Sequence, residues 1–419
     1  MPSRVNAAVL CAAVVCVVTS PLSAQERPDP SAIGASARAV GLSHAVTAVA
    51  NDAFSIGINP AGLSHLQQSE AAFVMRAMVA RTTAEGTTNS PTSTGFPRYS
   101  AGGEVTGTLD AIQFVGGAVP VKVFGRTVAA GFAYRRFDEG LRPGAFKQTR
   151  RNTNGRYFNT TTYNTTGGLR AMSPSLAVEV TDRVRLGVTA NILSGSSTYT
   201  VRTTPIAAGS APVAQTTRVA ERDFSGLAMD MGALVRLREG LQLGVHVTLP
   251  HDRPFTRDSA NISVPATRAA PMQIAVGAAM QLNAKTALSL DLRHAPWSSV
   301  ATTVDSSGAA IPSRVGVNDA ASIHVGWERD VSDEDKRGTL RLGAFARQTT
   351  SVDLNGEAIA AFGASMGKTW FTERGAFEMG LLVSRSTMWT RTSDSITTVS
   401  IANTDFALSI GYRKLLGKK

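Results

Sequence analysis

The chain has 419 residues, of which 43% are hydrophobic and 17% charged, and its mean hydropathy is 0.00. This balance excludes a bundle of transmembrane helices, and no long apolar stretch occurs after the N-terminus. The net charge of +11 is spread along the chain without a basic helix or an aromatic-basic module, so we predict no nucleic-acid partner.

Residues 1–24 have the pattern of a secretory signal peptide. An apolar run from Ala7 to Val18 follows a basic residue and precedes small residues that end at Ala24. This run is too short for a spanning helix, so we expect cleavage near Ala24 and export from the cytoplasm. Cys11 and Cys16, the only two cysteines, lie in this segment, so residues 25–419 have no thiol chemistry.

Residues 25–68 form the next predicted unit, a plug. The stretch from Gly34 to Leu63 is rich in Ala and Gly, and such small side chains suit a segment packed inside a confined lumen. Asn59-Pro60-Ala61-Gly62 predicts a turn that anchors the plug, because Pro fixes φ and Gly tolerates positive φ. The residues that we assign to the plug are Gly34, Arg38, Gly41, Asp52, Asn59, Pro60, Ala61 and Gly62.

Residues 69–419 fall into segments of alternating polarity, each about ten residues long, as in membrane barrels. In the clearest segment, Met272 and Val276 lie on one face and Gln273 and Gly277 on the other, since side chains alternate along a strand. We therefore predict an all-β fold, a 14-stranded antiparallel transmembrane barrel with the plug in its lumen. Its strands are expected near 70–81, 109–121, 126–137, 169–182, 183–195, 223–238, 241–250, 271–283, 285–297, 319–331, 338–349, 358–370, 375–388 and 403–413.

Short and long connections alternate strictly between these segments. Turns such as Arg238-Glu239-Gly240 alternate with long polar stretches such as 82–108, 138–168 and 196–222. In outer-membrane barrels the short turns are periplasmic and the long loops extracellular, which predicts that both termini lie in the periplasm. Stretch 138–168 combines cationic and aromatic residues; it either gathers an anionic amphiphile or only faces lipopolysaccharide, and we favour the second interpretation.

Charged residues within the strands are predicted to face the lumen, since a charge on the lipid face costs about 2–4 kcal/mol at the midplane. The candidate ligand or lumen contacts are His44, Phe54, Asp230, Arg236, Asp291 and Arg293. Arg38 and Asp52 are expected to pair with each other or with the charged members of that set. Gly116-Gly117 and Gly131 are candidate kinks, because Gly often marks bends in strands.

The plug sequence resembles the N-terminal hatch of the FadL/TodX family. The resemblance rests on the Gly34-x-x-Ala-Arg38-Ala-x-Gly41 start, the acidic Asp52 and the run Asn59-Pro-Ala-Gly-Leu63. A strand that opens at Ala270-Pro271-Met272 and the next strand, ending in Pro296-Trp297-Ser298, are also similar to that family. The chain departs from the family at Ser43-His44, where small residues, often Gly, are usual.

The resemblance implies a channel in the bacterial outer membrane for passive uptake of hydrophobic molecules, either long-chain fatty acids or aromatic hydrocarbons. It implies contact with outer-membrane lipid and lipopolysaccharide, and we expect a monomer. PorV-like secretion proteins share the hatch signature. The alternative is therefore a barrel that binds or shuttles secreted protein cargo and transports no solute.

We expect no enzymatic activity. Gly363-x-Ser365-x-Gly367 matches a nucleophile-elbow pattern, but it lies within a predicted strand and no His follows it. The histidines show no metal-ligand spacing, so neither a metal nor a cofactor is expected. Among the histidines we single out His44, inside the plug, which could bond a plug carbonyl or a ligand carboxylate.

Overall fold

The computed structural model describes residues 36–88, 100–138, 146–151, 157–207, 216–259, 262–300, 302–304, 310–312, 318–333, 337–352, 358–391 and 397–416. The predicted signal peptide and Gly34 lie outside these residues. Within them, no helix is long and apolar enough to cross a bilayer.

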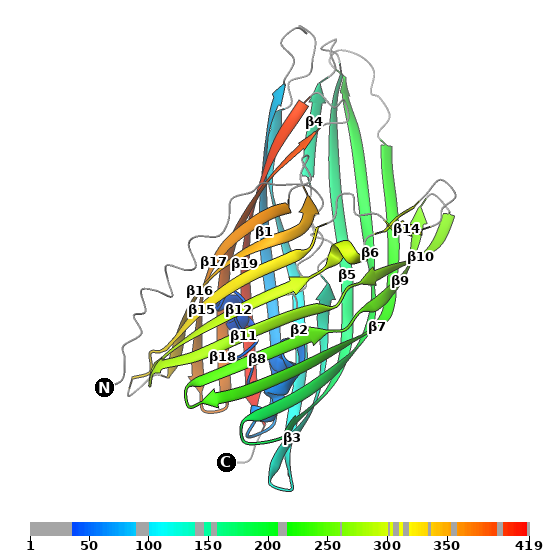
Figure 1. Ribbon diagram of the computed structural model, residues 1–419. Helices are drawn as coiled ribbons and strands as arrows, with labels where there is room; N and C mark the ends of the chain where they lie inside the picture. Colours follow the sequence, from blue (N-terminus) through cyan, green and yellow to red (C-terminus); the bar gives the residue numbers. More distant parts are fainter. Residues whose placement is uncertain are drawn as a thin grey trace.

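The strands form a closed 14-stranded antiparallel barrel, which confirms the predicted fold class (Figure 1). β1 pairs with β19 from Glu70↔Leu415 to Thr88↔Thr397 and so closes the ring. Three barrel strands are each divided into two successive parts: β3 and β4, β8 and β9, and β10 and β11. The strands are β1 Glu70–Thr88, β2 Ser100–Val123, β3 Arg126–Asp138, β4 Phe146–Arg151, β5 Tyr157–Glu179, β6 Val184–Ala207, β7 Thr216–Arg238, β8 Leu241–Thr248, β9 His251–Ser259, β10 Ile262–Ala270, β11 Gln273–Asn283, β12 Thr286–Ala295, β15 Ala320–Asp330, β16 Gly338–Val352, β17 Ala358–Thr372, β18 Gly375–Arg391 and β19 Thr397–Leu415, with a separate hairpin of β13 Thr302–Val304 and β14 Ala310–Pro312.

Each predicted strand segment has a counterpart in the barrel, but several strands are much longer than predicted. β2 begins at Ser100 rather than near 109, and β6 continues to Ala207 rather than ending near 195. The predicted loops at 82–108, 138–168 and 196–222 are therefore largely strand. These extensions are rich in Thr, which is β-branched and favours strands, but they lack the apolar face that alternation requires.

Alternation places apolar side chains outside and small or polar side chains inside. Met272 and Val276 at β11 are 46% and 44% exposed, whereas Ala275 between them is 6% exposed. The short turns, among them Phe124-Gly125, lie at the same end of the barrel as the C-terminus (Figure 1). The arrangement of turns therefore follows the predicted alternation.

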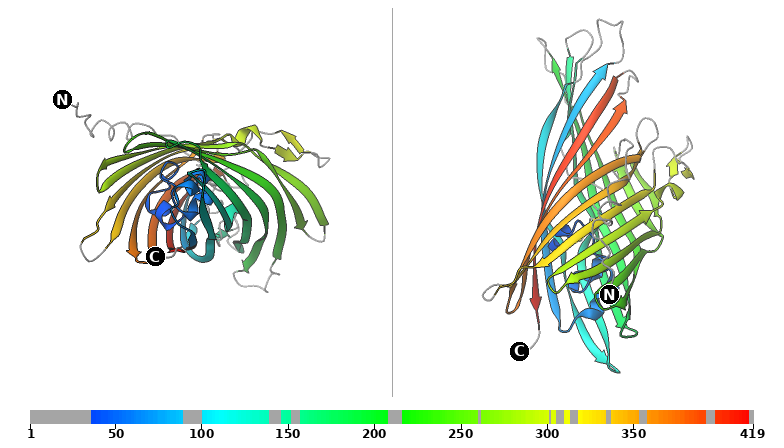
Figure 2. Two further views of the ribbon diagram at one scale, coloured as in Figure 1. Left: turned by 90° about the horizontal axis from the view of Figure 1, so that it is seen from below. Right: turned by 60° about the vertical axis from the view of Figure 1, so that its left-hand side comes forward.

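Residues 36–66, which we call the inner segment, lie inside the ring of strands (Figure 2). They comprise α2 Ala37–Gly41, η2 Ala53–Gly57 and η3 Pro60–His65. Phe54 and Leu63 are fully buried and share a hydrophobic cluster with Val74 of β1 and Phe114 of β2. The apolar residues of the inner segment thus form a hydrophobic core inside the lumen.

Gly116, Gly117 and Gly131, the candidate kinks, lie in stretches of regular register and do not have positive φ. Gly116 and Gly117 keep regular pairs with Ala72 and Ala71 of β1. Positive φ values within strands occur instead at Gly167, Gly168, Gly195 and Gly226. Gly195 pairs with Leu169 and Phe224, so these glycines form a line of bends across the adjacent strands β5, β6 and β7.

Candidate functional site

Three side chains cap the short helices of the inner segment, which explains why they form where they do. The Ser36 hydroxyl accepts a hydrogen bond from the Ala39 N–H at 3.0 Å, and the Asp52 carboxylate accepts one from the Phe54 N–H at 3.0 Å. Asn59 caps η3 in the same way, with Pro60 in its first turn. Side-chain acceptors at this position satisfy N–H groups that a helix leaves unpaired.

The predicted turn at Asn59 to Gly62 is therefore the start of a 3₁₀ helix. Gly62 does not have a positive φ; it is required because a Cβ there would meet the Ser55 Oγ at 2.5 Å and the Ala50 carbonyl oxygen at 2.6 Å. The Asn59 amide also donates to the Thr47 carbonyl at 2.9 Å and to the Ala233 carbonyl of β7 at 3.2 Å. This residue joins two parts of the inner segment to the wall.

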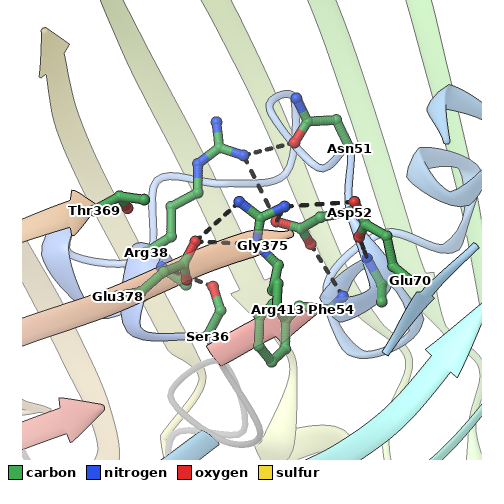
Figure 3. A network of polar contacts seen from close by, with 12 residues as sticks. Ser36, Arg38, Asn51, Asp52, Phe54, Glu70, Thr369, Gly375, Glu378 and Arg413 are labelled. Atoms are coloured by element: carbon green, nitrogen blue, oxygen red, sulfur yellow. Dashed lines mark hydrogen bonds and ion pairs between the residues drawn. The ribbon is translucent and has the colours of Figure 1, made fainter. Parts of the chain in front are cut away.

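Both charges of the inner segment take part in an ion-pair network (Figure 3). Arg38 lies 3.8 Å from Asp52 and donates to Asn51 at 2.6 Å and to Glu328 of β15 at 3.3 Å. Glu328 also accepts from Arg341 of β16 at 2.6 Å. Burial alone would lower the pKa of Arg38, but the opposing carboxylates Glu328 and Asp52 outweigh it and the pKa is raised.

Arg413 of β19 is the centre of the second half of this network. Its guanidinium lies 3.1 Å from Glu378 of β18, 3.7 Å from Glu70 of β1 and 3.8 Å from Asp52 (Figure 3). Glu70 in turn accepts from the Ala53 N–H at 3.0 Å. The inner segment is thereby bonded to both strands of the seam that closes the barrel.

These contacts change the predicted pairing. Arg38 and Asp52 do pair with each other, but their wall partners are Glu328 and Arg413 rather than Asp230, Arg236, Asp291 or Arg293. The residues that sequence reasoning missed are Glu70, Glu328, Arg341, Glu378 and Arg413. A usable signal was present, since each lies at an inward position in the part of its strand nearest a short turn or a chain end.

Asp291 of β12 binds the backbone of the inner segment. Its carboxylate accepts from the Val46 N–H at 3.0 Å, the Thr47 N–H at 2.9 Å and the Thr47 hydroxyl at 2.6 Å, and it is fully buried. Arg293 lies 3.2 Å from the same carboxylate and donates to the His44 carbonyl at 2.6 Å. Together they fix the middle of the inner segment.

Ser43 and His44 both have left-handed backbones, with φ of 49° and 66°. Non-glycine residues adopt this conformation at a cost, so surrounding contacts must hold it. The Ser43 carbonyl accepts from His324 Nδ1 at 2.6 Å, and the Ser43 hydroxyl lies 2.8 Å from that of Ser365. Because a carbonyl can only accept, His324 must carry its proton on Nδ1. This strained turn stands where the resembled family often has Gly.

Glycines of the wall form a collar around the inner segment. A Cβ at Gly343 would meet the Leu42 carbonyl carbon at 2.5 Å and the Ser43 nitrogen at 2.6 Å, and one at Gly367 would meet the Gly41 Cα at 2.9 Å. Several collar glycines face each other in register on neighbouring strands. The collar comprises Gly131, Gly187, Gly232, Gly244, Gly277, Gly326, Gly343, Gly367 and Gly380. The two backbones approach closely because these strands carry no side chain there.

A polar layer and an apolar layer line the wall on β3, β5, β6 and β7. In the polar layer Asp230 accepts from Arg135 at 3.0 Å, from Asn191 at 2.8 Å and from Thr248 at 2.7 Å. The apolar layer comprises Phe137, Leu169, Ala171, Leu193 and Ala228, with Phe224 packed against it. The strand order places the apolar layer further from the short turns than Asp230.

Three remaining candidates have other surroundings. Phe54 is fully buried, with its ring centroid 4.9 Å from that of Phe114. His44 is 5% exposed, and its ring lies edge-on to His324 at 6.4 Å. Arg236 is exposed at the end of β7 and donates to the Asp182 carbonyl of a short turn at 2.7 Å. Phe54 and His44 are thus buried within the packing of the inner segment rather than open to the lumen.

Ser365 lies on the wall of the barrel in contact with the inner segment. Its hydroxyl lies within β17, 2.8 Å from the Ser43 hydroxyl and 3.1 Å from the Gly41 carbonyl. The Ser of the Gly-x-Ser-x-Gly match therefore contacts the inner segment, beside the collar glycine Gly367. Among the described residues, no group of three or more His, Cys, Asp or Glu side chains could hold a metal ion.

Replacement of Asp291 by Ala is expected to free the middle of the inner segment. It would leave the Val46 and Thr47 N–H groups without their acceptor, at about 1–3 kcal/mol for each buried donor. Hydrogen exchange read by mass spectrometry should show faster exchange over residues 44–50, with residues 60–66 unchanged. Asp182→Ala, at an exposed turn, is the control. Unchanged exchange at 44–50 would contradict the anchoring role.

His65 is expected to make the inner segment sensitive to acid. Burial first, and then Arg185, lower the pKa of His65 from 6.5 to about 4. The unfolded segment therefore binds a proton at higher pH than the folded one. The stability that neutral, buried His65 contributes is complete above pH 6.5 and is lost as the pH falls towards 4. His65→Gln should flatten the fall in melting temperature between pH 7 and 4.5, whereas His294→Gln, at an exposed site, should not. If the melting temperatures of the wild type and of His65→Gln fall in parallel with pH, this role of His65 is contradicted.

Comparison with known proteins relates this architecture to solved structures. No protein-family model matches the sequence, and no curated protein matches it. A FadL homologue of Pseudomonas aeruginosa is similar with a TM-score of 0.62 at 14% identity, covering 91% of this chain and 98% of that one. The P. putida toluene transporter TodX gives 0.53 at 14% identity over 90% and 99%, and the monoaromatic hydrocarbon channel CymD gives 0.52 at 13% over 91% and 97%. The closed barrel with an N-terminal segment in its lumen thus has the fold of the FadL/TodX channels.

Proposed function

We propose that this protein is an outer-membrane channel for passive uptake of hydrophobic molecules, either long-chain fatty acids or aromatic hydrocarbons. The observation that carries the proposal is a closed barrel, apolar outside, whose lumen holds an N-terminal segment, in the fold of a FadL homologue and of TodX. An apolar outer face suits lipid, and the barrel leaves no unpaired edge in the bilayer. The inner segment would be the hatch.

The proposed path begins at the end of the barrel opposite the short turns. An apolar solute would meet the layer around Phe137, Leu169 and Leu193 before it reached the hatch. By resemblance, it would then leave sideways.

Uptake of a labelled long-chain fatty acid and of labelled toluene would test this proposal. The host would lack its own channels, and cells with and without this protein would be compared. Ser43→Cys with Ser365→Cys would lock the hatch to β17, since the two hydroxyl oxygens are 2.8 Å apart and residues 25–419 contain no other thiol. We expect uptake that oxidation abolishes and reductant restores, with each single Cys variant as the control.

A correctly folded, surface-displayed barrel that takes up neither solute would contradict the proposal. The alternative, a PorV-like barrel that binds secreted cargo, would then have to be tested by cross-linking to exported proteins.

A further inference from the structure

A β-bulge in β2 turns an extra side chain into the barrel. The register of β1 with β2 steps from Val74↔Phe114 to Arg76↔Asp110, so three residues of β2 oppose Met75 alone. Within the bulge Gln113 and Phe114 are 1% and 0% exposed, whereas Ile112 and Val115 on either side are 38% and 42% exposed. Two successive side chains therefore point inward, as bulges allow.

Gln113 lies next to Phe114 in β2, on the side of Phe114 that is further from the short turns. Phe114 packs on Phe54 of the inner segment, and Gln113 precedes Phe114 on a strand that runs towards the Phe124-Gly125 turn. Neither the Nε2 nor the Oε1 of Gln113 has a hydrogen-bond partner. Ser409 Oγ of β19, two strands away across Arg76, is also buried without one.

Buried amides in native proteins nearly always have partners, because an unmade hydrogen bond costs free energy. The Gln113 amide offers an NH₂ group that donates and a carbonyl oxygen that accepts, with no net charge. A hydroxyl group complements both, since it donates to Oε1 and accepts from Nε2. An ionised carboxylate would face Oε1 with a second acceptor. Two cations lie nearby. Arg135 is already bonded to Asp230, Asn191 and Ser173, and Arg76 of β1 is buried and has contacts of its own.

We propose that Gln113 binds the hydroxyl group of an otherwise apolar, uncharged solute such as a phenol or an alkyl alcohol. This inference rests on the proposed channel function and adds a preference within it. Because Gln113 is 1% exposed, the solute must displace neighbouring side chains to reach it. The gain of two hydrogen bonds for a previously unpaired amide favours that displacement.

The test compares p-cresol with p-xylene, which have the same shape but differ by a hydroxyl in place of a methyl group. Uptake of each labelled solute would be measured in the channel-deficient host with the wild type and with Gln113→Leu. We expect p-cresol uptake to fall about tenfold, as for one or two hydrogen bonds of ordinary net strength, and p-xylene uptake to stay the same or rise. Gln281→Leu, at an exposed position near the end of β11, is the matched control.

The melting temperature of the purified barrel separates binding from structure. Replacing an unpaired amide by an apolar side chain of similar size should leave the melting temperature unchanged or raise it, and Gln113→Met should behave alike. Equal loss of both solutes, no loss of p-cresol, or a fall in melting temperature would overturn the inference while leaving the channel function intact. A wild type that takes up neither solute would count against the channel function as well.

Discussion

Gly343→Ala is expected to displace the inner segment from its position against the wall of the barrel. The added methyl carbon would lie 2.5–2.6 Å from Leu42 and Ser43 backbone atoms, so no side-chain rotation can relieve the clash. Overpacking of this kind typically costs about 1–3 kcal/mol. The strained turn at Ser43-His44 is held by contacts on the same side of the barrel, so it should be lost first.

Trypsin provides a direct readout of this displacement. Arg38 is the only Lys or Arg between residues 28 and 75, so cleavage in that interval reports one site. It is protected in the folded protein by Glu328, Asn51 and Asp52. We expect cleavage after Arg38 in Gly343→Ala but not in the wild type. Ala344→Val, which adds methyl groups on the outer face of the same strand, is the control. If Gly343→Ala and Ala344→Val are equally protected from trypsin, the wall accommodates the added methyl group without displacing the inner segment.

The barrel was predictable because its signal is local and repeated. Alternation in segments such as 271–283 places Met272 outside and Gly277 inside, and no distant contact is needed to read it. The caps Ser36, Asp52 and Asn59 are equally local. The polar extensions of the long strands were missed because they lack an apolar face, so no alternation of apolar and polar residues marks them. Gln113 was hidden for the opposite reason, since a bulge breaks the alternation that prediction relies on.

The partners of the inner segment could not be predicted in the same way. Arg38 and Glu328 are 290 residues apart, and their contact depends on strand stagger and on how the segment is seated. A sequence pattern for the collar did exist: successive strands carry Gly at inward positions, as at Gly326, Gly343 and Gly367. Glycine weakens a strand, so its repetition at one level indicates that another backbone approaches there.

Arg413→Met is expected to produce the largest loss of stability. It would leave Glu378, Asp52 and Glu70 without their shared cation, and these residues are 0%, 3% and 7% exposed. Removing one partner of a buried ion pair typically costs about 3–5 kcal/mol, because the remaining charge stays desolvated. Since Glu70 and Arg413 belong to the two strands that close the ring, the loss should weaken that seam.

The midpoint of heat-induced unfolding, followed by the mobility shift of the barrel on gels, measures this effect. Arg126→Gln breaks the exposed pair with Asp182 and should change the midpoint little, since surface pairs contribute about 0–1 kcal/mol. Adding Glu378→Gln to Arg413→Met should recover part of the loss, because it removes the most buried of the carboxylates that had Arg413 as a partner. If Glu378→Gln destabilises the barrel equally with and without Arg413, the two residues are not coupled. The inner segment would then be held by its backbone contacts, Asp291 and the glycine collar, rather than by charge.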